Sequence, residues 1–170
     1  GLMRLLPHMT VVTPCDYNQT YKAVMKAVET EGPFYVRFYR DKTPNFTNPD
    51  EEFQLGKAQI LREGKDVTLV ASGLLVWEAL KAAEVLEKDG INAKVINIHT
   101  IKPIDVEALV KAADETNLVI TCEDHQKQSG LYGAVSEVLS LHRPTQMDYV
   151  AVEDTFGESG TMEELMRKYK

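Results

Sequence analysis

From residue 58 onward, short apolar runs rich in β-branched residues alternate with segments of helical periodicity, and this alternation is the strongest constraint on the fold. A short edge strand is expected at 59–62. The alternation predicts further strands at 66–72, 93–98, 118–122 and 148–152 and helices at 75–88, from Asp105 to 113, at 130–141 and at 161–169. Strands alternating with helices of this length imply a parallel sheet joined by right-handed crossovers. The predicted fold class is therefore α/β.

The first forty residues predict a smaller unit of the same kind. A strand is expected at 9–13, and a helix follows, capped by Asp16 with Gln19 three residues on. The helix carries apolar residues at helical spacing: Ala23, Val24, Ala27 and Val28. Gly32 and Pro33 end it before a second strand at 34–38. One βαβ unit buries little surface alone, so we interpret it as a partial unit.

Residues 41–57 are rich in Pro, Asn, Asp and Gly and lack periodicity, which is typical of a linker. The predicted organisation is a fragment at 1–48, a linker at 49–57 and a domain at 58–170.

The charge balance and the two cysteines limit the class of protein. The net charge is -7 and the pI is near 5.1, the opposite of the balance expected for a protein that binds nucleic acid or an anionic membrane. Cys15 and Cys122 match no metal-ligand spacing and are interpreted as packing residues. Because there is no secretory signal and no run long enough to span a bilayer, a reduced cytoplasmic protein is expected.

The stretch from Leu118 to Gly133 combines an apolar run, a polar turn and two glycines before a helix. Backbone N–H groups at the start of that helix could receive a phosphate. The glycine spacing matches neither GxGxxG nor GxxxxGK[ST]. We therefore favour the interpretation that Ser129 caps the helix and that Gly130 and Gly133 permit close packing.

Glu123, Asp124 and His125 stand at the end of that strand, where open α/β sheets often bind ligands. They could do acid–base chemistry, or they could form a solvated strand end that contacts a neighbouring domain. Neighbouring strand residues point to opposite faces, so the three would not converge on one substrate. His8 and His99 adjoin apolar runs and are interpreted as turn or domain-contact residues. His142 ends a predicted helix, where a cation is favourable.

Arg37 and Arg40 follow the second strand of the N-terminal unit. An arginine at a strand end suits a phosphate or carboxylate, because its fork donates two parallel hydrogen bonds. Alternatively, both pair with local carboxylates such as Asp41. By alternation the two arginines face opposite ways, so at most one is expected to reach a given ligand.

Several motifs together resemble a known family. DVTLVASG (66–73), EALKAAEVLEKDGINAKVINIHTIKPID (78–105) and LVITCEDH (118–125) with SGLYGAV (129–135) resemble the C-terminal domain of the transketolase-like, thiamine-diphosphate-dependent enzymes. The ending DTFGESGTMEELMRKY (154–169) is similar to that of transketolases themselves. MRLLPHMTVVTPCDYNQTYKAVMKAV (3–28) and GPFYVRFYRDKTP (32–44) resemble the end of the family's pyrimidine-binding domain.

The resemblance implies a three-layer, Rossmann-like parallel sheet preceded by a partial βαβ unit. It implies transfer of a two-carbon ketol unit between sugar phosphates, as in the pentose phosphate pathway, with thiamine diphosphate and Mg²⁺ in the complete enzyme. Arg40 matches the family's substrate-phosphate arginine, whereas Arg37 matches a position that is arginine only in some relatives. The family's cofactor-activating glutamate and metal motif lie outside these 170 residues. This chain alone is therefore expected to hold no cofactor, metal or catalytic residue and to be inactive.

The implied partners are an N-terminal transketolase portion or subunit, a second copy in a homodimer, and sugar phosphates. Two relatives in the same cofactor class stay open as alternatives: 1-deoxy-D-xylulose-5-phosphate synthase, which shares the two-arginine pattern, and the β-subunit of a 2-oxoacid dehydrogenase. The FGxSG ending favours transketolase over both. A non-catalytic assembly or regulatory module is the alternative from a different class.

Overall fold

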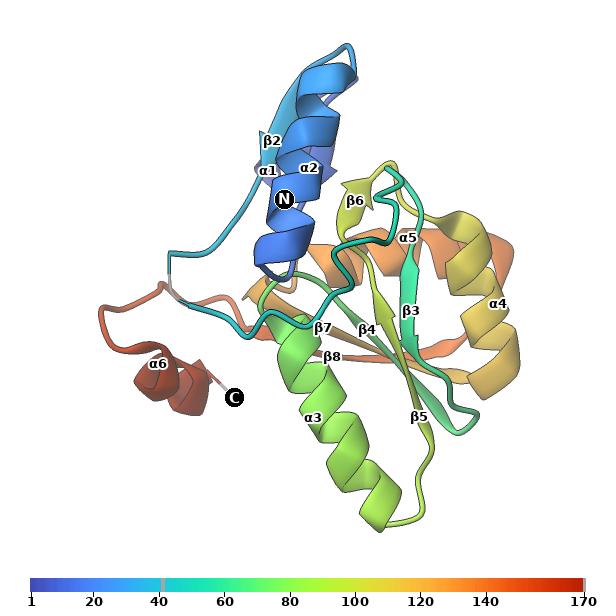
Figure 1. Cartoon of the computed structure of the whole chain (residues 1–170). Helices are drawn as coiled ribbons and strands as arrows, with labels where there is room; N and C mark the ends of the chain where they lie inside the picture. The colour runs from blue at the N-terminus through green and yellow to red at the C-terminus, as the bar shows by residue number, and fades with distance from the viewer. Residues whose placement is uncertain (41, 170) are drawn as a thin grey trace.

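The larger of two sheets forms the body of the C-terminal region, as Figure 1 shows in a computed structural model that describes residues 1–40 and 42–169. Its strand order is β3-β5-β4-β7-β8. The strands are β3 (Gln59–Arg62), β4 (Val67–Ala71), β5 (Ala93–Asn97), β7 (Leu118–Gln126) and β8 (Gln146–Val152). Strands β5, β4, β7 and β8 are mutually parallel, which confirms the predicted α/β class.

The predicted edge strand β3 is present but runs antiparallel to β5. Only four residues, 63–66, connect β3 to β4. A parallel arrangement needs a crossover of a dozen or more residues, whereas so short a connection lets the chain only reverse its direction. The sheet is therefore parallel except at this edge.

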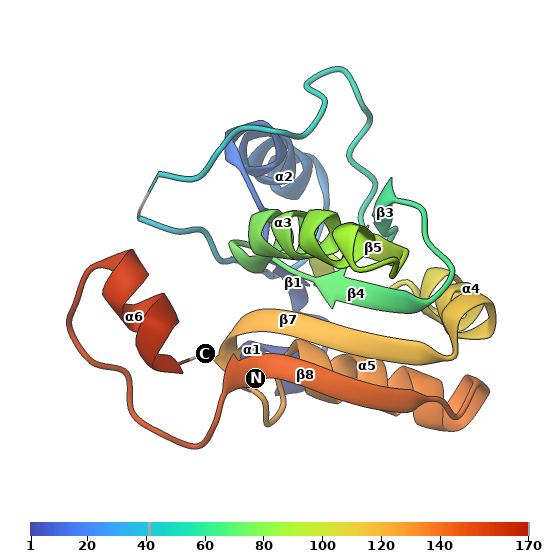
Figure 2. The same cartoon turned by 90° about the horizontal axis from the view of Figure 1, so that it is seen from below.

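Three helices cover the two faces of the sheet and complete three layers (Figure 2). They are α3 (Leu75–Lys88) on one face and α4 (Val106–Thr116) and α5 (Leu131–His142) on the other. Every residue of β4 and β5 is buried, as expected for parallel strands covered on both sides. Asp105 caps α4 by accepting the Ala108 N–H at 3.1 Å, as its position before the helix predicts.

The N-terminal residues form the predicted βαβ unit, with β1 (Thr10–Val12) parallel to β2 (Phe34–Val36) and α2 (Tyr17–Glu29) between them in sequence. A third strand, β6 (Thr100–Lys102), lies antiparallel on the other side of β1. Neither β6 nor the short helix α1 (Leu2–Leu5) was predicted. The strand β6 is recognisable only by its pairing with a segment ninety residues away. It joins the N-terminal unit to the C-terminal region within one sheet.

Helix α2 buries only part of its apolar surface. Ala23 is buried, whereas Val24 and Val28, predicted on the same face, are exposed. Tyr17 and Tyr21 add further exposed aromatic surface. The small sheet of the N-terminal unit covers one side of the helix, and the described residues leave the other side uncovered.

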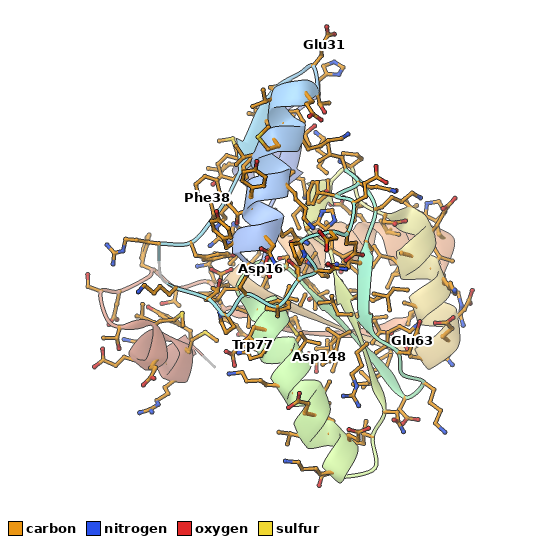
Figure 3. The ribbon with its side chains drawn as sticks, in the orientation of Figure 1. Asp16, Glu31, Phe38, Glu63, Trp77 and Asp148 are labelled. Carbon is orange, nitrogen blue, oxygen red and sulfur yellow. The ribbon has the colours of Figure 1, made fainter. Side chains whose placement is uncertain are left out.

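Asp16 ties the irregular segment before residue 58 to the start of α2 (Figure 3). Its carboxylate is 3 % exposed and caps the helix through the Gln19 N–H at 2.9 Å, as predicted. The same carboxylate accepts the backbone N–H groups of Phe46 at 2.9 Å and Thr47 at 2.6 Å, and the Thr47 hydroxyl at 2.7 Å. Part of the segment predicted as a linker is thus held by hydrogen bonds. The domain limits at 1–48, 49–57 and 58–170 stay a prediction.

The C-terminal end extends beyond the sheet. Strand β7 is four residues longer than the predicted 118–122, because Gln126 still pairs with Val152 of β8 after an irregularity. The last helix, α6 (Met162–Tyr169), lies outside the layers of the sheet (Figure 1), and its Met166 packs against the apolar cluster beneath α3. The predicted capping box is present: the Thr161 N–H donates to the Glu164 carboxylate at 2.9 Å, and the Glu164 N–H donates to the Thr161 hydroxyl at 3.4 Å.

Candidate functional site

The candidate site lies beyond the carboxyl ends of β4 and β7. The crossover that follows β4 leads to β5 on one side, whereas the crossover that follows the adjacent strand β7 leads to β8 on the other side. Such a topological switch point opens the crevice in which α/β sheets bind ligands. In this protein, residues that follow β2 in the N-terminal unit enter that crevice.

Arg37 reaches across to Asp124 on β7. Its two terminal nitrogens lie 3.0 Å and 2.9 Å from the two carboxylate oxygens, and Nη2 also donates to the Asp124 carbonyl at 3.2 Å. Burial by itself would lower the pKa of Arg37, but the carboxylate beside it prevails and raises that pKa. The carboxylate that Arg37 contacts is thus eighty-seven residues away in the chain, whereas the alternative was a local one. Asp41, the residue named for that pairing, lies outside the described residues.

Tyr39 completes this contact. Its hydroxyl donates to Asp124 Oδ1 at 2.8 Å and accepts from Arg37 Nη1 at 3.1 Å. Burial and the neighbouring carboxylate both raise the pKa of Tyr39, so the phenol keeps the proton that it donates. Sequence reasoning missed Tyr39, because a tyrosine three residues beyond the end of a strand gives no signal until its partner is known.

Arg40, the predicted phosphate-binding residue, is exposed. It lines a cavity of about 310 Å³ together with Tyr39, Asp124 and residues of β8 and α6. Among residues 1–40 and 42–169 it forms no ion pair. The acidic Glu158 on the same cavity pairs with Lys168 at 2.5 Å. Arg40 and Arg37 thus have different surroundings, one at an open cavity and the other against a carboxylate.

Glu123 is committed to the start of α5. Its carboxylate accepts the backbone N–H groups of Leu131 at 2.6 Å and Tyr132 at 2.8 Å, so Glu123 rather than Ser129 caps this helix. Gly130 permits this approach, because a β-carbon there would overlap the carboxylate. Glu123 is 5 % exposed, and burial raises its pKa to about 6 against the opposing effect of the two N–H groups. The interpretation of a solvated strand end is wrong for Glu123.

Glu123, Asp124 and His125 do not converge, as the alternation along the strand predicts. Asp124 faces Arg37, whereas Glu123 faces α5. The His125 Nδ1 atom lies 2.8 Å from the Gln126 carbonyl oxygen. Glu123 and His125 share a face of the strand, with a carboxylate oxygen 3.9 Å from Nδ1. Hydrogen bonds to the start of α5 and to the Gln126 carbonyl already engage these two groups.

The remaining candidates have structural surroundings. His99 is buried, and its ring lies 4.3 Å from that of Phe53, which confirms a contact between segments. His8 is exposed and has a φ of 59°. His142 ends α5, as predicted. Cys15 and Cys122 are buried in the same apolar cluster, which confirms their packing role.

In residues 1–40 and 42–169, no three His, Cys, Asp or Glu side chains gather in a way that could hold a metal ion. Over the same residues, none of the helices has the length and apolar character needed to cross a membrane.

Known proteins are similar to this chain over nearly its whole length. Residues 56–170 match the family model described as "Transketolase, C-terminal domain". The 6-deoxy-6-sulfo-D-fructose transketolase subunit SqwH of Clostridium sp. (strain MSTE9) is 42% identical over 169 residues, which are 99% of this chain and 52% of that protein. A putative transketolase C-terminal section of Methanocaldococcus jannaschii is 40% identical over 99% of this chain and 54% of its own length. The chain spans about half the length of these relatives.

A solved structure described as a split gene transketolase in an inactive beta4 tetramer superposes with a TM-score of 0.96 at 47% identity. The match covers 99% of this chain and 55% of that one, so it includes the N-terminal unit as well as the larger sheet. The family match, the two relatives and this structure agree with one another. The chain belongs to the transketolase family, and residues 56–170 form its C-terminal domain.

Proposed function

We propose that this chain is part of the C-terminal polypeptide of a transketolase made from two kinds of subunit. The enzyme transfers a two-carbon ketol unit between sugar phosphates with thiamine diphosphate and Mg²⁺. Three observations support the division: one relative is called a subunit, another a C-terminal section, and the similar structure is described as split gene. The missing partner is an N-terminal transketolase subunit.

Arg40 binds the anionic group of the sugar substrate. The observation that carries this assignment is the exposed guanidinium of Arg40 at the cavity beside the crevice, within the motif RDKTP. A guanidinium fork suits phosphate and sulfonate alike, and the Clostridium relative is named for a sulfonated sugar. Arg37 is already paired with Asp124, whereas Arg40 has no ion-pair partner among residues 1–40 and 42–169.

The cofactor is held by the parts of the enzyme that precede residue 1 and by the partner subunit. When bound, thiamine diphosphate supplies the nucleophilic carbon that attacks the donor carbonyl. The chain described here contributes a substrate contact and assembly surfaces, and alone it is inactive. We further propose that two copies of the complete assembly form a dimer in the cytoplasm.

The test is Arg40→Ala in the assembled enzyme. Losing a hydrogen bond to a charged group costs roughly 1.5–3 kcal/mol, so the KM for ribose 5-phosphate is expected to rise roughly tenfold to a hundredfold. The KM for glycolaldehyde, an acceptor without a phosphate, stays unchanged. Arg143→Ala is the matched control, because Arg143 pairs with Asp114 beyond the far end of α5. An unchanged KM for ribose 5-phosphate in Arg40→Ala would refute the assignment.

A substrate comparison separates the alternatives within the cofactor class. The proposal predicts activity with xylulose 5-phosphate and ribose 5-phosphate and none with pyruvate and glyceraldehyde 3-phosphate. The reverse would identify 1-deoxy-D-xylulose-5-phosphate synthase. A chain that dimerises but leaves the partner subunit's activity unaltered would instead be a non-catalytic assembly module.

A further inference from the structure

The switch-point crevice of the C-terminal domain is occupied by side chains of the N-terminal unit. Ala71 of β4 pairs with Cys122 of β7, so Gly73 and Asp124 stand level, two residues beyond that pair. The Tyr39 phenol lies over Gly73 and bonds to Asp124. Tyr39 and Arg37 therefore take the position in which a free-standing domain of this kind would hold a ligand.

Two residues of the C-terminal domain, Gly73 and Asp124, fit this contact with the N-terminal unit. Gly73 has a φ of +56°, and a β-carbon there would overlap the Tyr39 hydroxyl, so the end of β4 is shaped to admit the phenol. Asp124 supplies a planar carboxylate that matches the Arg37 fork atom for atom. The Arg37–Tyr39–Asp124 cluster is partly buried, with side-chain exposures of 31% for Arg37 and 23% for Asp124.

The cluster restrains the backbone on the approach to Arg40. Arg37 is held at its backbone, where its N–H donates to the Val12 carbonyl at 2.8 Å, and at its side chain by Asp124. Tyr39 is held by the same carboxylate and directly precedes Arg40. With residues 37 and 39 both anchored beyond the end of β2, the C-terminal domain sets the direction of the backbone that leads into residue 40.

We propose that Arg37, Tyr39 and Asp124 are positioning residues that aim Arg40 at the substrate's anionic group. This inference rests on the function proposed for Arg40. It assigns the C-terminal domain a part in substrate recognition, because Asp124 acts on the substrate only through Arg40. It also separates the two arginines by role, with Arg37 held against Asp124 and Arg40 assigned to the substrate.

A double-mutant cycle in the assembled enzyme tests this role. The variants are Asp124→Asn, Arg40→Ala and the pair together, with KM and kcat measured for ribose 5-phosphate and for glycolaldehyde. Misplacing a binding group by a fraction of an ångström weakens its contribution, so Asp124→Asn is expected to raise the ribose 5-phosphate KM roughly tenfold. The kcat and the glycolaldehyde KM stay unchanged. In the Arg40→Ala background, Asp124→Asn has no further effect, because the residue that it positions is gone.

Tyr39→Phe keeps the ring over Gly73 and the charge balance while removing the two hydrogen bonds of the hydroxyl, to Asp124 and from Arg37. It is expected to raise the same KM by roughly threefold, and it carries the test if Asp124→Asn does not assemble. Glu137→Gln is the matched control. It disrupts another bidentate arginine contact between the N-terminal segment and the C-terminal domain, in which Arg4 donates to Glu137 at 2.7 Å. This contact does not adjoin a residue that is proposed to bind the substrate.

The outcomes separate the two proposals. If Arg40→Ala leaves the ribose 5-phosphate KM unchanged, the function proposed for Arg40 fails. If Arg40→Ala raises that KM but the effect of Asp124→Asn adds to it in full, the cluster is only structural and the positioning role fails. A lower KM in Asp124→Asn would also overturn it, because released Arg37 would then bind the phosphate itself.

Discussion

The phenol oxygen of Tyr39 occupies the space that a β-carbon on Gly73 would take. Gly73 also has a φ of +56°, which costs an L-residue with a side chain roughly 1–2 kcal/mol. Gly73→Ala must therefore strain the backbone and displace Tyr39 from Asp124. We expect it to lower the free energy of unfolding by about 2–4 kcal/mol in urea denaturation.

Gly90→Ala is the control for that measurement. Gly90 has a φ of +81° but no neighbouring atom within 4 Å of a β-carbon, so only the backbone cost applies. Its expected loss is about 1 kcal/mol. Equal losses in the free energy of unfolding of the two variants would contradict a specific packing contact between Tyr39 and Gly73.

The Asp16 carboxylate predicts a larger effect than an ordinary helix cap. Asp16→Ala removes the cap of α2 and also leaves the N–H groups of Phe46 and Thr47 without their acceptor. We expect a loss of about 3–4 kcal/mol in the free energy of unfolding. Thr161→Ala, which removes an exposed cap of α6, should cost about 1 kcal/mol or less. If Asp16→Ala cost no more than Thr161→Ala, the segment around Thr47 would not depend on Asp16.

Glu123 predicts a pH dependence of stability. Its folded-state pKa of about 6 lies above the ordinary value of 4.5, chiefly because the carboxyl is buried. The folded state therefore favours the protonated form. This contribution is complete below pH 4.5 and is lost as the pH rises through 6, and it amounts to about 2 kcal/mol.

Glu123→Gln removes this titration but retains an oxygen that accepts an N–H. Urea denaturation at pH 7.5 and pH 4.5 should show the wild type gaining about 2 kcal/mol over Glu123→Gln at the lower pH. A relative loss for the wild type at pH 4.5 would place the folded-state pKa below 4.5 and contradict the effect of burial.

Local patterns predicted most of the fold. The β-branched runs at 66–72 and 93–98 become the fully buried strands β4 and β5. Asp16 and Asp105 cap helices where their positions indicate. These features depend on periodicity and on hydrogen bonds between residues three or four positions apart. A short stretch of sequence specifies both. The strand β6 and the direction of β3 escaped prediction, because pairing between distant segments leaves no local pattern.

The sequence likewise predicted only part of the candidate site. Arg37 and Arg40 were recognised from residue type and from their position after a predicted strand. Both lie beyond the end of β2, so alternation within a strand does not explain their different surroundings. The partner of Arg37 was not foreseen, because Asp124 is eighty-seven residues away. Ser129 was predicted as a cap from its place before a helix, but the buried Glu123 carboxylate fits the open side of Gly130 and takes that role.

By itself, the sequence determined the α/β class, the order of the strands and helices, the resemblance to transketolases and the two arginines worth considering. Only the tertiary structure decided which arginine is neutralised and which lines an open cavity. It also decided that the N-terminal unit occupies the crevice of the C-terminal sheet. The physical reason is that an ion pair depends on which carboxylate the packed elements bring within about 3 Å, and that distance is set by the assembly of the whole chain.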